Sequence, residues 1–143
     1  HFPTKTALLA AVLDQEDATE ASFDERSRAV GFIRSILEIV QRNLERREIV
    51  RMFSIVSVEA THPGHEAHEW LRERYERVTA DYATQIVYDR ARGRLLGEDD
   101  PLEVAGLVMT GWEGIQIRWL ADGTDPVAAM DQLMTALLRP SAN

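Results

Sequence analysis

Residues 102–121 read LEVAGLVMTGWEGIQIRWLA, and this stretch decides the fold class. When it is drawn as a helix with about 100° per residue, the large apolar side chains fill one wide arc. In place of a charged face, the opposite side carries a strip of small residues with two apolar neighbours: Gly106, Thr110, Gly114, Leu107 and Ile117. Small residues at this spacing let a second helix approach closely. The stretch therefore predicts a helix that is covered on two sides.

What covers the second side has two interpretations. In the first, this helix and the helix of residues 127–138 pack on a partner subunit, giving a dimeric four-helix bundle with twofold symmetry. The predicted interface residues are then Gly106, Leu107, Thr110, Gly114, Ile117, Met130, Met134 and Leu137. In the second, the helix is the centre of a monomeric bundle and its own chain covers it.

Helical periodicity continues on both sides of this stretch. The predicted helices span residues 4–13, 24–45, 48–61, 63–92, 102–121 and 127–138. Residues 14–22 are polar and acidic and read as a frayed helix end or a loop. Residues 93–100 read as a loop, and Asp122–Pro126 reads as a turn with an N-cap. Residues 48–61 are apolar all round, which also permits a strand, but their helical neighbours favour a helix. We expect an all-α domain of about six helices, with a mixed α/β fold as the alternative.

Composition limits the class of protein. The chain has 143 residues, 45% of them hydrophobic, which is enough for one domain with a sizeable core. Cysteine is absent, so disulfides and cysteine-based zinc sites are excluded. The sequence has no apolar run long enough to span a membrane and no signal-peptide pattern, so we expect a cytoplasmic protein. The net charge of −8 predicts that this chain alone binds nucleic acid poorly, because phosphates repel it.

We predict a ligand pocket between the helices of residues 24–45, 48–61 and 63–92. Its expected walls are Phe32, Ile36, Met52, Phe53, Val56, Trp70, Tyr75, Tyr82, Met109, Trp112 and Trp119, with Ser57, Glu59 and Gln116 as polar groups. Plain core packing is the alternative for each aromatic residue. Glu59 lies on a helix with almost no polar face, so it could bind a cationic or hydrogen-bonding ligand. Alternatively it is a surface residue near the helix end, or a partner of Arg72 or Arg74.

Histidines at 62, 65 and 68 form the only cluster with metal-ligand character. His65 and His68 share a helix face, and such spacing can hold zinc or nickel. Capping of a helix start is the alternative, so these two residues are weak metal candidates and we expect no cofactor. The sequence has neither a Gly-rich phosphate loop nor a nucleophile with a plausible base, and we therefore expect no enzymatic activity.

The first 13 residues, HFPTKTALLAAVL, resemble the junction between the recognition helix and the next helix in TetR-family transcriptional regulators. An aromatic-Phe-Pro-Ser/Thr-Lys run before a Leu-rich helix carries the resemblance. Residues 44–75, with Ala60-Thr61-His62-Pro63 and Arg72-Glu73-Arg74-Tyr75, are similar to many actinobacterial members. So are residues 100–120. The similarity covers most of the chain.

The resemblance implies a homodimeric regulator, expected to be a repressor. A small, mostly apolar effector would release operator DNA from an N-terminal helix-turn-helix head. Residues 1–13 would then be the end of the recognition helix, with His1 and Phe2, and a linker helix. Residues 14–143 would be the ligand-binding and dimerisation domain, and most of the head would be missing. Thr4 and Lys5 match positions near the DNA backbone. The alternatives are a His-dependent helical metalloprotein and a ligand-free helical interaction module.

Overall fold

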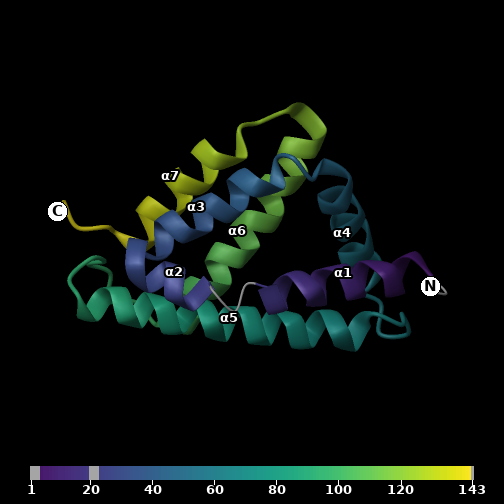
Figure 1. Ribbon diagram of the computed structural model, residues 1–143, viewed down its shortest axis with the longest axis horizontal. Coiled ribbons are helices and arrows are strands. Elements are labelled where there is room, and N and C mark those ends of the chain that lie inside the picture. Colours follow the sequence, from purple (N-terminus) through teal and green to yellow (C-terminus); the bar gives the residue numbers. More distant parts are fainter. Residues whose placement is uncertain (1–3, 20–22, 143) are drawn as a thin grey trace.

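The computed structural model describes residues 4–19 and 23–142, and these residues form a bundle of seven helices (Figure 1). The helices are α1 (Lys5–Thr19), α2 (Phe23–Val30), α3 (Phe32–Asn43), α4 (Arg47–Glu59), α5 (His68–Ala91), α6 (Pro101–Asp122) and α7 (Pro126–Leu138). Within the described ranges, extended pairing amounts to one isolated bridge between Leu95 and Pro140. The all-α prediction is confirmed, and the strand alternative for residues 48–61 is wrong because α4 covers most of them.

The long helix α5 runs along one side of the molecule and joins two packed clusters (Figure 1). The larger cluster lies between α3, α5, α6 and α7, and its fully buried side chains include Phe32, Ile86, Val108, Met130 and Met134. The smaller cluster lies between α1, α4 and the first turns of α5, around Leu9, Val56 and Leu71. Both clusters include residues of α5, and a space remains between the two clusters.

Gly31 divides a segment that we predicted to be one helix over residues 24–45. Its φ of 97° and ψ of 152° lie in a region that only glycine adopts readily, so α2 ends and α3 begins there. The first turn of α3 is capped by Asp89, whose Oδ2 accepts a hydrogen bond from the backbone N of Phe32 at 2.7 Å. The prediction of one continuous helix is therefore wrong. Local sequence did not indicate the break, because the carboxylate that caps α3 comes from a distant part of the chain.

Two other predicted boundaries also move. The segment 14–22, expected to be a frayed helix end or a loop, continues α1 as far as Thr19, and residues 20–22 lie outside the described residues. The helix expected from residue 63 begins at His68 instead. Imidazole nitrogens hold the intervening chain in turns, since His62 Nδ1 accepts from the Gly64 amide and His65 Nδ1 from the Ala67 amide, both at 3.0 Å. These side-chain bonds compete with helix formation.

Three helix starts follow their local sequence. Thr4 caps α1 by accepting a hydrogen bond from the Ala7 amide, Asp100 caps α6, and Asp125 caps α7. Pro101 and Pro126 occupy the first position of their helices, where the missing amide proton is tolerated. These caps confirm the predicted Thr4 N-cap and the predicted turn before the last helix.

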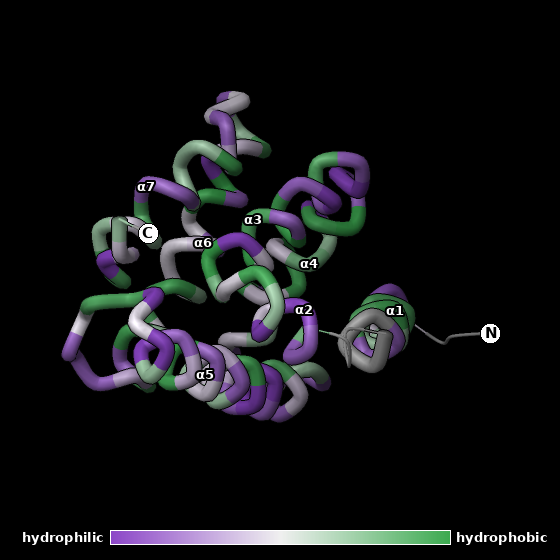
Figure 2. Tube along the Cα trace, turned by 60° about the vertical axis from the view of Figure 1, so that its left-hand side comes forward, coloured by the Kyte–Doolittle hydropathy of each residue, from purple (hydrophilic) through white to green (hydrophobic). Residues whose placement is uncertain are grey.

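Hydropathy follows the packing (Figure 2). Hydrophilic residues line the outer side of α5, and α1 lies to one side of the other helices. In the two described ranges, no helix combines the length and the apolar character that a membrane crossing requires.

Candidate ligand-binding cavity

A cavity of about 280 Å³ lies between the two packed clusters, and α1 to α6 all contribute to its wall. This volume is close to the lower end of the range for small-molecule sites, roughly 300 Å³. The apolar part of the wall includes Leu13, Phe23, Ile39, Ile49, Phe53 and Trp112. A second, more open hollow of about 670 Å³ lies outside α3 and α7. The first cavity is the better ligand site because it is partly closed and its walls shield a bound molecule from water more than those of the second hollow do.

Five of the predicted wall residues line this cavity: Phe53, Tyr82, Met109, Trp112 and Gln116. They come from three different helices, α4, α5 and α6. Gln116 is only 4% exposed, which matches its expected role as a buried polar group.

The other predicted wall residues lie elsewhere. Phe32 and Ile36 are buried in the larger cluster, where the Phe32 ring packs edge-on against Tyr82 with centroids 5.2 Å apart. The smaller cluster holds Met52, Val56, Trp70 and Tyr75. None of these six residues lines the cavity. A helical wheel identifies the buried side of each helix, but it does not say which neighbour fills the space.

Glu59 is a surface residue near the end of its helix, which is the alternative that the sequence left open, and it does not line the cavity. It is the last residue of α4, its side chain is 58% exposed, and Oε2 lies 3.8 Å from His65 Nε2. The helix ends at this residue, and its carboxylate therefore reaches solvent.

The charged part of the cavity wall was not predicted. It consists of Asp24, Arg46, Arg74, Arg77, Asp81 and Glu113. On a helical wheel most of these residues resemble an ordinary solvated face. Glu113 is the exception, because it is the only charged residue between Glu103 and Arg118. A carboxylate in the middle of an apolar helix was the signal that would have found this part of the wall.

Two charged groups of the cavity wall have incomplete hydrogen bonding, Glu113 and Arg74; the Arg74 Nε is buried without a hydrogen-bond partner in the described ranges, although the residue has other interactions. The Glu113 Oε1 is buried and has no hydrogen-bond partner among residues 4–19 and 23–142. Burial, and then interaction with the Glu113 carboxylate, raise the pKa of the Tyr75 hydroxyl, while Arg74 and Ser57 act in the opposite direction. Tyr75 therefore stays protonated and neutral behind Glu113. The guanidinium of Arg74 lies over the Phe53 ring, 5.1 Å from its centroid.

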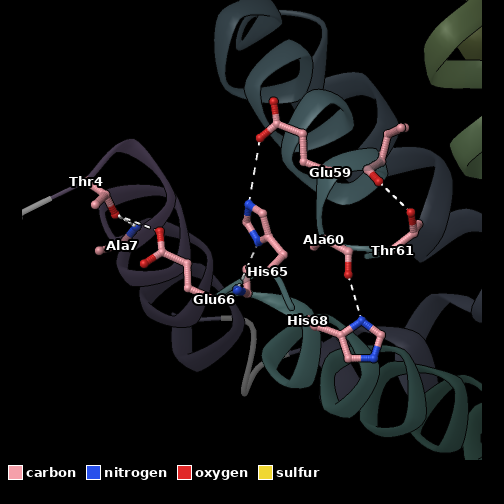
Figure 3. A network of polar contacts seen from close by, with 10 residues as sticks. Thr4, Ala7, Glu59, Ala60, Thr61, His65, Glu66 and His68 are labelled. Atoms are coloured by element: carbon pink, nitrogen blue, oxygen red, sulfur yellow. Dashed lines mark hydrogen bonds and ion pairs between the residues drawn. The ribbon is translucent and has the colours of Figure 1, made fainter. Parts of the chain in front are cut away.

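The histidines form a structural network at the junction of α1, α4 and α5 (Figure 3). His68 Nδ1 lies 2.8 Å from the Ala60 carbonyl oxygen, and His65 uses Nδ1 for the Ala67 amide. The Thr4 hydroxyl donates to Glu66 Oε1 at 3.2 Å. In the described part of the chain, no three His, Asp or Glu side chains are placed to hold a metal ion. His65 and His68 therefore fit the capping alternative.

The outer side of α6 carries most of the predicted interface. Leu107 and Ile117 are each 52% exposed, and a Cβ on Gly106 or Gly114 would meet no described atom within 4 Å. Thr110 is exposed and donates its hydroxyl to the Gly106 carbonyl at 2.9 Å.

The contribution predicted for α7 is different. Met130 and Met134 are 0% exposed in the larger cluster, and Leu137 packs against it. Met130 and Met134 therefore offer no surface to a partner. The wheel correctly identified one apolar face on this helix, but that face is directed into the chain's own core.

Thr4 and Lys5, the predicted DNA-backbone contacts, lie at the start of α1. Both are exposed, and the Thr4 side chain is engaged with Ala7 and Glu66. His1, Phe2 and Pro3, which carry much of the family resemblance, lie outside the described residues.

Comparison with protein-family models gives no match for this chain, and the searches of curated proteins and of solved structures give no significant match either. Function is therefore inferred from the cavity and the surfaces themselves.

Proposed function

We propose that this chain is the effector-binding and dimerising domain of a TetR-type transcriptional regulator, acting as a repressor. The observation that carries the proposal is that α6 serves two surfaces. One side of α6 contributes Met109, Trp112, Glu113 and Gln116 to the cavity. The other side presents Leu107 and Ile117 around a strip of small residues.

Such a helix can couple ligand binding to the geometry of a dimer. A small, mostly apolar effector in the cavity contacts one side of α6, and a partner subunit packs on the other. A shift of α6 that favours the bound state changes the arrangement of the two subunits, which is a coupling between two sites. Monomeric proteins bury large apolar side chains where they can, so paired exposed residues on one helix favour an interface.

The first helix extends this coupling toward the DNA. Leu13 of α1 lines the cavity, and Thr4 at the other end of α1 bonds to Glu66 in the turn before α5. In the proposed regulator, α1 links the effector domain to a helix-turn-helix head, and Thr4 and Lys5 lie near phosphates. The net charge of −8 requires that the head supplies the DNA affinity.

The dimer is tested by light scattering on the 143-residue chain after size-exclusion chromatography. We expect a dimer, and we expect Leu107→Glu or Ile117→Glu to give a monomer that keeps its helical circular dichroism. Val87→Glu is the matched control, since Val87 is 51% exposed, to nearly the same extent, but lies on α5. A wild-type chain that is monomeric at all concentrations would contradict the proposal.

The effector role is tested by a thermal-shift screen over small apolar molecules, with Trp112 substitutions to locate the hits. We expect stabilisation that Trp112→Ala abolishes. A dimer that no small molecule stabilises would instead support a ligand-free interaction module.

A further inference from the structure

We infer that the cavity binds a ligand with an apolar body and one hydrogen-bond-donating end group, an ammonium or a hydroxyl, which donates to Glu113 Oε1. This inference rests on the proposed function in one respect, that the cavity is the effector site. The ligand class follows from the wall residues themselves.

The body of the ligand must be apolar because most of the wall is. Phe53, Met109 and Trp112 present an aromatic and thioether surface from α4 and α6, and Tyr82 closes the wall from α5. The volume of about 280 Å³ suits a small molecule with one or two rings. Aromatic walls of this kind supply binding energy through burial of apolar area.

The end group is expected to donate because one oxygen of the Glu113 carboxylate is a buried acceptor that lacks a donor, although Tyr75 hydrogen-bonds to the same carboxylate. Glu113 Oε1 is buried without a hydrogen-bond partner among the described residues. A buried carboxylate oxygen without a hydrogen-bond donor costs more free energy than a buried neutral polar group without a partner. A ligand N–H or O–H at this position removes that cost, and the buried Gln116 amide lies one turn further along α6.

Tyr75 prepares Glu113 for this role. Burial and the nearby carboxylate raise the pKa of the Tyr75 hydroxyl, which therefore stays neutral beside Glu113 and does not add a second negative charge. Tyr75 packs with the smaller cluster and does not line the cavity, so it acts as a positioning residue.

The charges of the wall argue against an anionic ligand. The three arginines are Arg46, Arg74 and Arg77, and the three carboxylates are Asp24, Asp81 and Glu113, so their formal charges sum to zero. Each arginine already has an interaction within the chain, and Arg74 lies over Phe53, although its Nε is buried without a hydrogen-bond partner among the described residues. A ligand carboxylate near Glu113 would meet a like charge in a partly desolvated site.

Three probes with one body test this inference: 2-naphthylmethylamine, 2-naphthylmethanol and 2-naphthoate. Isothermal titration calorimetry on the 143-residue chain measures each affinity. We expect the amine and the alcohol to bind and the carboxylate to bind at least tenfold more weakly. Glu113→Gln should weaken the amine by roughly tenfold or more, because the charge of the acceptor is lost. The alcohol should lose less, because the amide oxygen still accepts.

Glu103→Gln is the matched control, since it removes the same charge from an exposed position on the same helix. It should leave all three affinities unchanged. Glu113→Asp keeps the charge but withdraws it by one methylene, and it replaces Glu113→Gln if that variant does not fold. With this variant we expect weaker binding of both donors.

Three outcomes would overturn the inference: tighter binding of 2-naphthoate, an amine affinity that Glu113→Gln leaves unchanged, or binding of none of the probes. The oligomeric state separates these failures from failure of the proposed function. A dimeric chain that another apolar compound stabilises keeps the regulator proposal and loses this ligand class. A monomeric chain that binds the amine through Glu113 keeps the ligand class and loses the regulator proposal.

Discussion

The carboxylate of Asp89 in α5 caps α3, whose first residue, Phe32, lies 57 positions earlier in the chain. Asp89 is 1% exposed; its Oδ2 accepts from the Phe32 amide, and its Oδ1 accepts from Arg94 Nη1 at 3.0 Å. This contact fixes the start of α3 against α5. It thereby positions Ile39 and Asn43, which line the cavity near the other end of α3.

Removal of this cap should be among the most damaging changes in the chain. We expect Asp89→Ala to lower the free energy of unfolding by about 2–3 kcal/mol, because it leaves the buried Phe32 amide without its acceptor and removes one of the two acceptors of Arg94 Nη1. Asp89→Asn should cost less, since its amide oxygen can still accept from Phe32. Urea denaturation followed by circular dichroism measures both. Glu38→Gln, which removes an exposed pair with Arg26, is the control and should leave the midpoint nearly unchanged. Equal midpoints for Asp89→Ala and the wild type would contradict the assigned cap.

The backbone at Gly31 should reject a side chain although there is room for one. A Cβ there would lie 3.6 Å from Asp89 Oδ2, an ordinary contact, but φ is 97°. We therefore expect Gly31→Ala to cost about 1–3 kcal/mol through backbone strain alone. The urea midpoint measures the loss. If Gly31→Ala were as stable as the wild type, α2 and α3 would have to be one continuous helix.

Gly114→Ala should have opposite effects on folding and on association. Within one chain a Cβ at Gly114 meets no described atom within 4 Å, so alanine should stabilise α6 by about 0.5–1 kcal/mol. Between two chains the same methyl group would hold closely packed helices apart. We expect a higher melting temperature at concentrations that favour the monomer, together with a weaker dimer in sedimentation velocity. A dimer of unchanged or greater strength would exclude close packing at this strip.

The turn after α6 should keep its structure in acid. Hydrogen bonds from the Thr124 hydroxyl and then from its amide, followed by Arg118, lower the pKa of Asp122 to about 2. Its folded pKa lies below the unfolded value of about 3.9. The contribution of Asp122 to stability is therefore complete above that value and is lost as the pH falls through about 2. A carboxyl titration by NMR should show this midpoint, and Thr124→Ala should raise it, whereas Thr135→Ala on α7 should not.

Local patterns predicted most of the fold. The apolar arc of α6 and the N-caps at Thr4 and Asp125 depend on neighbouring residues, and these features are present. The expectation that the apolar helix of residues 48–61 is buried on most sides is wrong, because Ile55 and Val58 of α4 are 53% and 65% exposed. The division at Gly31 could not be predicted in this way. A single glycine inside a helical pattern is tolerated, and the carboxylate that makes the break favourable belongs to another helix.

The cavity was predictable only in part, for a related reason. Phe53 and Trp112 were identified because large apolar residues on inward faces tend to meet. Whether such residues meet around a cavity or inside a packed cluster depends on how the helices cross, and Phe32 and Val56 are in clusters. Glu59 and Glu113 are both carboxylates on apolar helices. Glu59 is exposed because it lies at the end of its helix, whereas Glu113 lies inside its helix and lines the cavity.

The histidine turn should be indifferent to metal ions, because the Nδ1 atom of each ring already contacts the backbone and no three side chains in the described part of the chain are placed to share an ion. The Ala60 carbonyl can only accept, so His68 carries its proton on Nδ1. His65 accepts from the Ala67 amide through Nδ1, which places the proton of the neutral ring on Nε2, toward Glu59. Binding of a metal ion by His65 would break one of these contacts.

We therefore expect that neither EDTA nor one equivalent of Zn²⁺ changes the melting temperature. His65→Ala and His68→Ala should each lower stability by about 1 kcal/mol through the lost backbone bonds, with or without metal. His62→Ala, at an exposed position, serves as the control and should have the smallest effect. A zinc-dependent rise in melting temperature that His65→Ala abolishes would show that the turn rearranges into a metal site, and the capping role would then be wrong.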